Sequence, residues 1–147
     1  MMETFRSIEQ KLKEGIVYER KLRRLQKELA ELRSQYGDIV HPLKAEGGRS
    51  NLPSDPVGKL ATDILEEEER IVSQIQETRR MKKELKEMIE TFCIDDIQAD
   101  VLIRRYVYFQ DYDSIAEDMM YEIRNIFKLR RKGIQLIVRT INNASVQ

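Results

Sequence analysis

The sequence has little of what catalytic and metal sites are usually built from. It contains one cysteine, Cys93, and one histidine, His41, which are far apart in the chain. It has neither a glycine-rich phosphate loop nor a spaced set of cysteine and histidine ligands. We therefore expect a protein that is not an enzyme and that needs no cofactor or metal, with His41 as a solvated residue.

Disulfide bonds and membrane spans are lacking as well. A single cysteine cannot form an internal disulfide, and Cys93 lies between Phe92 and Ile94, which favours a reduced, intracellular protein. No run approaches the roughly 18 apolar residues of a membrane-spanning helix. The first residues contain no apolar signal core. We expect a soluble protein of the cytoplasm.

Glycine and proline are scarce, with six and three residues, while charged residues make up 35% of the chain. Such a composition favours long helices around a limited core. Residues 3–36 contain no proline, and their apolar side chains alternate steps of three and four, the pattern of a coiled-coil seam. The seam residues are Leu22, Leu25, Leu29, Leu32 and Tyr36. We expect this helix to weaken at Gly15, by about 1 kcal/mol relative to alanine, and to end at Gly37.

A second long helix is predicted for residues 56–93, after a flexible loop at 37–55. Asp55 is suited to the N-cap of this helix, and Pro56 to its first position. Its seam has two interpretations, because it either keeps a polar middle that fixes register or drifts onto neighbouring apolar residues. The polar middle would be Glu67, Gln74 and Thr78, and the alternative would be Leu65, Val72 and Ile75.

Two helices of similar length joined by a flexible loop fit an antiparallel hairpin. Each helix of such a hairpin buries only one stripe, so the remaining apolar residues favour self-association, most simply as a dimer. These residues are Ile16, Val17, Leu65, Val72, Ile75 and Ile89. We assign residues 1–93 to this oligomerising hairpin.

Charge is unevenly distributed in the last third of the chain, although the total is zero. Residues 95–120 hold seven acidic residues and two arginines, a net charge of −5. Residues 121–147 hold six basic residues and one glutamate, a net charge of +5. The zero total excludes a uniformly basic protein that coats nucleic acid. A cationic field confined to one helix would instead let a groove-reading element find phosphates.

The apolar pattern in residues 94–142 predicts three helices. Asp95 can cap the first, which runs to about residue 107. The second spans about residues 113–120 and the third about 121–141, each with one inward face. The side chains expected to face inward are Ile115, Ala116, Met119, Ile126, Leu129, Ile134 and Ile137.

The third of these helices combines side chains that proteins use to read DNA. Arginine can donate two hydrogen bonds to guanine, and asparagine can pair bidentately with adenine. Because the first turns usually meet base edges, Arg124, Asn125 and Lys128 are assigned to bases and the later cations to phosphates. The candidate DNA-binding residues are Ile123, Arg124, Asn125, Lys128, Arg130, Arg131 and Lys132.

Residues 105–131 also follow a known order. The run contains Arg105-Tyr106, then Tyr112-Asp113-Ser114-Ile115-Ala116-Glu117, and then Tyr121 ahead of Ile123-Arg124-Asn125-Ile126-Phe127-Lys128-Leu129. This order resembles the sigma region 4 type of helix-turn-helix. With its hairpin and the restart Asp55-Pro56-Val57-Gly58, the whole chain resembles small phage and prophage regulators of the ArpU and RinA kind. Where those proteins usually have glycine in the turn, this chain has Met120.

The resemblance implies a role in transcription of late phage genes. The expected fold is all-α, with a long antiparallel hairpin followed by a small helix-turn-helix domain at 94–142 and a tail at 143–147. The expected function is a sequence-specific transcriptional regulator whose partner is double-stranded DNA, with a dimer reading two half-sites. Two alternatives remain: a phage terminase small subunit, and an adaptor that binds RNA polymerase through acidic residues 111–118.

Overall fold

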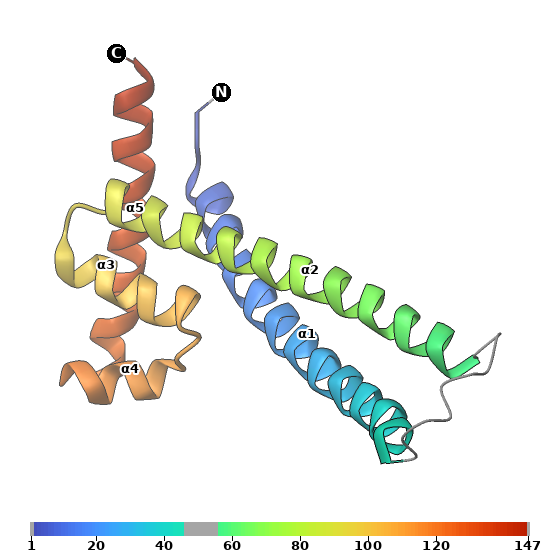
Figure 1. Ribbon diagram of the computed structural model, residues 1–147. Helices are drawn as coiled ribbons and strands as arrows, with labels where there is room; N and C mark the ends of the chain where they lie inside the picture. The colour runs from blue at the N-terminus through green and yellow to red at the C-terminus, as the bar shows by residue number, and fades with distance from the viewer. Residues whose placement is uncertain (1, 46–55, 147) are drawn as a thin grey trace. The chain divides into compact units, whose positions relative to one another are not determined.

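The structure, a computed structural model, describes residues 2–45 and 56–146, with side chains for 2–39 and 56–145. All regular structure within these residues is helical, which confirms the expected class (Figure 1). The elements are α1 (Phe5–Ala45), α2 (Pro56–Phe92), α3 (Asp96–Leu102), the π-helical segment η1 (Ile103–Val107), α4 (Tyr112–Met119) and α5 (Ile123–Val146). None of the helices described here is both long enough and apolar enough to span a membrane.

The chain divides into two compact units. One unit comprises Met1–Arg20 and Arg79–Gln147, and the other comprises Lys21–Thr78. This division differs from the boundary expected at residue 93. The N-terminal turns of α1 and the last turns of α2 pack against α3, η1 and α5, and therefore belong to the same unit as those elements. The two units are described separately below.

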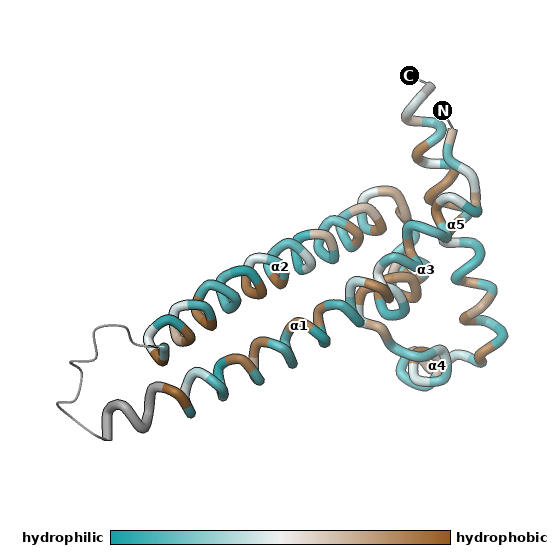
Figure 2. The backbone as a smooth tube through the Cα atoms, turned by 90° about the vertical axis from the view of Figure 1, so that its right-hand side faces the viewer, coloured by the Kyte–Doolittle hydropathy of each residue, from teal (hydrophilic) through white to brown (hydrophobic). Residues whose placement is uncertain are grey.

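The unit Lys21–Thr78 is a pair of antiparallel helical segments. Leu22 and Leu25 of α1 pack with Ile71 and Ile75 of α2, and all four side chains are buried. Farther along α1, Arg33 Nε lies 3.0 Å from Glu68 Oε1, so the partners on α2 descend in number as those on α1 ascend. Figure 2 shows apolar residues as separate bands along both helices, as a narrow seam requires. The hairpin packing expected from the sequence is therefore present.

The seam of α2 combines parts of both sequence interpretations. Ile75 and Thr78 are buried, whereas Gln74 is exposed and Leu65 is 43% exposed. The Thr78 hydroxyl donates to the backbone carbonyl of Gln74 at 2.8 Å, so the buried polar group is satisfied within its own helix. Burial of Ile75 and Ile89 within the chain also removes them from the apolar residues expected to be free for self-association.

The first helix continues beyond the predicted end at Gly37. α1 runs to Ala45, through Gly37 and the His41-Pro42 pair. Tyr36 and Ile39 are half-buried, so the apolar stripe passes Gly37 and outweighs the modest helix penalty of one glycine. The remainder of the predicted loop, residues 46–55, and the predicted cap at Asp55 lie outside the described residues. α2 begins at Pro56 as expected.

The other unit has a larger core. One cluster of buried side chains joins the first turns of α1 and the last turns of α2 to α3, η1 and α5. It contains Ile8, Leu12, Leu85, Ile89, Cys93, Ala99, Leu102, Tyr106, Val107, Ile134 and Ile137. Gly15 is buried beside this cluster, and a Cβ atom there would lie 2.2 Å from the backbone oxygen of Tyr106. Gly15 is therefore a packing requirement and not the weak point that the sequence predicted.

The predicted tail is helical. α5 extends to Val146, beyond the end expected near residue 141. The Asn142 side chain accepts from the backbone N–H of Glu3 at 2.9 Å and donates to the carbonyl of Glu3 at 3.0 Å. These contacts with Glu3 anchor the last turns of α5. Local sequence patterns do not reveal them, because the two residues are far apart in the chain.

Candidate nucleic-acid interface

The helix pair α4 and α5 is joined by a three-residue turn, residues 120–122. Asp111 caps α4, because its Oδ1 accepts from the backbone N–H of Ser114 at 2.8 Å. Met120 ends α4 in the left-handed conformation, with φ 60° and ψ 39°. The N–H groups of Met120 and Tyr121 donate to the carbonyls of Glu117 and Ala116, which is a Schellman motif. The turn therefore has the geometry usually given to glycine.

A small core holds this helix pair against α3. Val101, Ile115, Ala116 and Ile126 are buried together, with Tyr112, Met119 and Leu129 packed around them. The inward-facing set expected from the sequence is confirmed. In Figures 1 and 2, α4 lies across the N-terminal end of α5. One side of α5 is consequently committed to packing, and the opposite side is left for other contacts.

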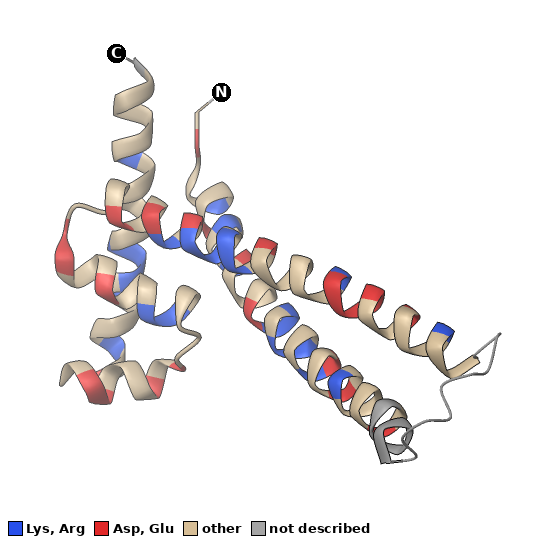
Figure 3. Cartoon of the chain, in the orientation of Figure 1, with Lys and Arg blue, Asp and Glu red and all other residues tan. Residues whose placement is uncertain are grey.

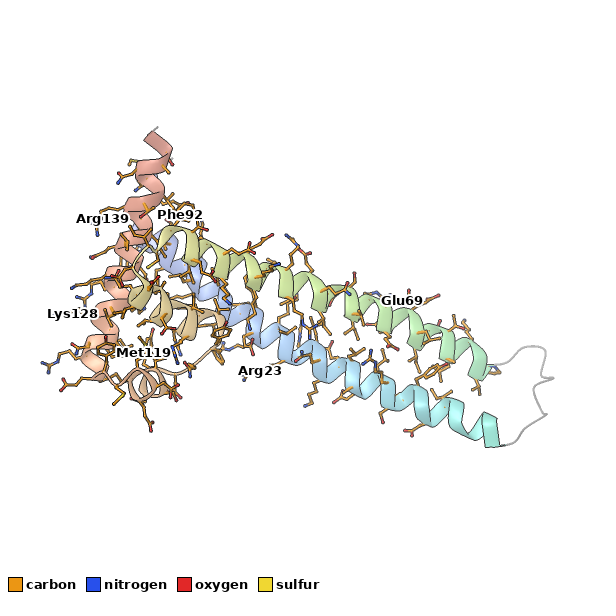
Figure 4. All side chains as sticks on the ribbon, turned by 60° about the vertical axis from the view of Figure 1, so that its left-hand side comes forward. Arg23, Glu69, Phe92, Met119, Lys128 and Arg139 are labelled. Carbon is orange, nitrogen blue, oxygen red and sulfur yellow. The ribbon has the colours of Figure 1, made fainter. Side chains whose placement is uncertain are left out.

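The free side of α5 carries a row of cations. Arg124, Lys128 and Arg131 are exposed and lie four and three residues apart, so they share one face of the helix. Lys132 and Arg139, also exposed, widen and extend this basic row, which we define by these five residues. Figure 4 shows Lys128 and Arg139 pointing away from the packed helices. α5 contains no acidic residue.

No carboxylate of the described residues forms an ion pair with any member of the basic row. Two nearby carboxylates are already engaged, since Asp118 pairs with Arg104 and Asp111 caps α4. Figure 3 shows basic residues along α5 and acidic residues on α4. The row is thus a set of unneutralised positive charges on a rigid helix, which suits a polyanionic ligand.

Asn125 lies at the edge of the basic row that faces α3. Together with Lys128 and Tyr121 it lines a shallow groove of about 190 Å³, whose opposite wall includes Asp95 and Gln98. Asp95 Oδ1 accepts from the backbone N–H of Gln98 at 2.9 Å, the predicted cap of α3. Asn125 is exposed and has room to approach a ligand that covers Lys128.

Arg130 is separated from the other candidate residues. Its Nε donates to the Tyr106 hydroxyl at 2.7 Å, and its Nη2 pairs with Glu9 of α1. Burial alone would lower the pKa of the Arg130 guanidinium, but the hydrogen bonds to Glu9 and Tyr106 raise it. Arg130 therefore links α5 to α1 and η1 through these two contacts, which we call the Arg130 tie. The sequence predicted that Arg130 contacts phosphates, but its guanidinium is occupied by Glu9 and Tyr106. The sequence did not reveal this role, because Arg130 is adjacent to Arg131 of the basic row and has the same chemistry.

The same tie changes the protonation of its two partners. The hydrogen bond from Arg130 lowers the pKa of the Glu9 carboxyl, despite partial burial of that group. Burial raises the pKa of Tyr106 to about 12, with the Arg130 hydrogen bond acting in the opposite direction. Glu9 is therefore ionised and Tyr106 neutral at physiological pH. The contact fixes α1, η1 and α5 to one another within their unit.

Two apolar residues of α5 lie on its exposed side. Ile123, one of the candidate binding residues, is 41% exposed. Phe127, which is not among the candidate binding residues, is 42% exposed. Its ring lies 4.8 Å from that of Tyr112 in α4. Sequence periodicity could have identified Phe127, since it is four residues from Ile123 and three from Arg124.

Of the cysteine and the histidine in this chain, the structure describes only the cysteine side chain. Among the residues described, no three histidine, cysteine or acidic side chains gather in a metal-binding arrangement. Cys93 is buried, and burial raises the pKa of its thiol to about 11. A thiol with that pKa is protonated at neutral pH and a poor nucleophile. The side chain of His41 lies outside the described residues.

Comparison of this chain with protein-family models, with curated proteins and with solved structures finds no match.

Proposed function

We propose that this protein is a sequence-specific DNA-binding transcriptional regulator that places the first half of α5 in the major groove. The observation that carries the proposal is the basic row, which projects unpaired from the face of α5 opposite its buried side. The short α4, the three-residue turn and the following basic helix match the order of elements in a helix-turn-helix. α4 would then cross the phosphate backbone while α5 reads the bases.

The residues on α5 divide by position into two roles. Arg124, Asn125 and Lys128 lie in the first two turns, where recognition helices meet base edges. Arg131 and Lys132 follow one turn later and are assigned to phosphates. Arg130 is left out, because its guanidinium is bound to Glu9 and Tyr106.

Selection of bound sequences from random duplex DNA, followed by affinity measurements on the enriched duplex, tests the proposal. Arg124→Ala with Lys128→Ala should abolish preference for that duplex over random DNA, since each well-formed base contact contributes about 1–3 kcal/mol of discrimination. The control removes two exposed cations elsewhere in the same unit, Arg79→Ala with Lys83→Ala, and should keep the preference. Equal loss in both variants, or no enriched sequence, contradicts the proposal.

We also propose that the protein acts as a dimer that presents two copies of α5. The support is the outer face of α2, where Leu65 is 43% exposed and Val72 half-buried in a shallow groove bordered by Glu68 and Glu69. A narrow two-helix seam leaves such a face uncovered. Light scattering should give twice the monomer mass. A ring-sized assembly would instead favour a role like that of a terminase small subunit.

A protein-binding adaptor is the second candidate, and the acidic residues of α4 favour it. Asp113 and Glu117 are exposed, and within the described residues neither carboxylate has a hydrogen-bonded or ionic partner. They could meet a basic surface of RNA polymerase in addition to DNA contacts by α5. Asp113→Asn with Glu117→Gln should then reduce polymerase binding and leave DNA affinity equal or higher. An adaptor that does not bind DNA would show no salt-dependent affinity for random duplex.

A further inference from the structure

Phe127 is an apolar side chain placed directly beside the basic row. It lies three residues after Arg124 and four before Arg131, so it borders both on the helix surface. The small core beneath α5 is filled by other residues, including Ile126 and Leu129, and Phe127 remains 42% exposed. Part of the ring is therefore left free after α5 has packed against α3 and α4.

A stack of side chains holds the Phe127 ring in place. The ring centroids of Phe127 and Tyr112 are 4.8 Å apart, with the planes tilted by 52°. The guanidinium carbon of Arg105 lies 4.5 Å from the centroid of the Tyr112 ring, and Arg105 Nη1 donates to the carbonyl of Gln110 at 3.0 Å. Tilted aromatic pairs and cation–π contacts are both favourable arrangements. The stack presents the free part of the Phe127 ring in a defined position next to Arg124.

We propose that Phe127 contacts the C5-methyl group of a thymine in the major groove and so determines specificity at one base pair. This inference rests on the proposed function, because it requires α5 to enter the groove. The thymine methyl is the apolar group that base edges offer there, and phenylalanine is among the side chains that contact it. Cytosine lacks this methyl, so the contact discriminates between the two pyrimidines. The neighbouring cations provide affinity, and Phe127 provides the preference for thymine over cytosine at this position.

Replacement of thymine by uracil tests the contact, because it removes only the methyl group. The probe is the duplex enriched from random DNA by the full-length protein, with each thymine changed to uracil in turn and affinity measured by fluorescence anisotropy. One position should weaken binding by about fourfold, the equivalent of one buried methyl group. Phe127→Ala should weaken binding to the thymine duplex by a similar factor and should no longer distinguish uracil from thymine at that position.

The matched control is Tyr108→Ala, which removes another exposed aromatic side chain, 57% exposed, from the same unit. It should retain the thymine preference of the native protein. Circular dichroism of each variant establishes that helicity is kept. Native protein that binds the duplex but responds to no uracil substitution, or a Phe127→Ala variant that discriminates as well as native protein, overturns this inference alone. Failure to bind any duplex overturns the proposed function together with it.

Discussion

The two units of this protein differ in how their own helices pack. In Lys21–Thr78 two helices share a narrow seam, with Leu22 and Leu25 packed on Ile71 and Ile75. In the other unit, several elements converge so closely that Gly15 has no space for a Cβ atom, and a charged tie joins Arg130 to Glu9. The difference indicates that the position of α5 is tightly fixed, whereas the narrow seam of the hairpin segment leaves apolar side chains such as Leu65 partly exposed.

The largest effect is expected from a pair of glycine substitutions. Gly15→Ala should destabilise its unit by about 3 kcal/mol, because the new Cβ would lie 2.2 Å from the Tyr106 oxygen and 2.6 Å from Leu85 Cδ2. Gly37→Ala in the other unit meets no atom within 4 Å and should stabilise α1 by about 0.5–1 kcal/mol. Urea unfolding measures both. Similar effects of the two substitutions would contradict the comparison between the units.

The second pair removes an arginine from each unit. Arg130→Ala should cost about 2 kcal/mol, since it leaves the buried Tyr106 hydroxyl without its donor and leaves Glu9 with only the longer ion pair to Lys13 at 3.7 Å. Arg33→Ala breaks the ion pair with Glu68, but the Arg33 side chain is 59% exposed, so the cost should be below about 0.5 kcal/mol. Thermal unfolding distinguishes the two. An Arg130 variant as stable as the Arg33 variant would show that the tie is not structural.

A smaller effect is expected at the turn before α5. Met120 has a positive φ of 60° and a side chain that is 91% exposed, so Met120→Gly should relieve backbone strain without loss of packing. We expect a gain of about 1 kcal/mol or less, because glycine also makes the unfolded chain more flexible. Met120→Ala keeps the strain and should leave the free energy of unfolding nearly unchanged. If Met120→Ala also stabilised the protein, the gain would come from removal of the methionine side chain and not from relief of backbone strain.

The smallest effect concerns acid sensitivity. The Arg130 hydrogen bond lowers the pKa of Glu9 below its ordinary value of 4.5, so the ionised form stabilises the folded state. This contribution is fully present above about pH 4.5 and is lost as pH falls through the lowered pKa. Glu9→Gln should therefore show a shallower loss of stability below pH 4.5 in unfolding curves measured at several pH values. An unchanged slope would mean that Glu9 is not the responsible group.

Patterns within a single element could be predicted from the sequence. The seam at Leu22 and Leu25, the cap at Asp95 and the inward Ile115 and Ile126 all depend on spacing along one helix, and the structure places them as expected. Contacts between distant residues could not be predicted. Gly15 against the Tyr106 backbone is an example, because it depends on how helices cross and not on any local repeat.

In the candidate interface, too, contacts between residues distant in sequence could not be predicted. Arg130 and Arg131 are adjacent and chemically identical, and the positions of Glu9 on α1 and Tyr106 on η1 commit Arg130 alone to the interior. Phe127 was not among the candidate binding residues, yet its ring is 42% exposed beside them, because the core beneath α5 is filled by Ile126 and Leu129. The conformation of Met120 was also not predictable, because methionine does not signal a left-handed turn.

Salt dependence of DNA binding tests the central claim most directly. The affinity of the full-length protein for a fluorescent duplex is measured across a range of salt concentrations, for native protein, for Arg131→Ala with Lys132→Ala, and for the Arg79→Ala with Lys83→Ala control. We predict that native affinity falls steeply with salt and that the substitution of Arg131 and Lys132 reduces the slope of log K against log salt by about 0.9 for each phosphate that the protein no longer neutralises. The control should keep the native slope. Salt-independent binding by the native protein, or equal slopes in all three proteins, would contradict the assignment of α5 to DNA.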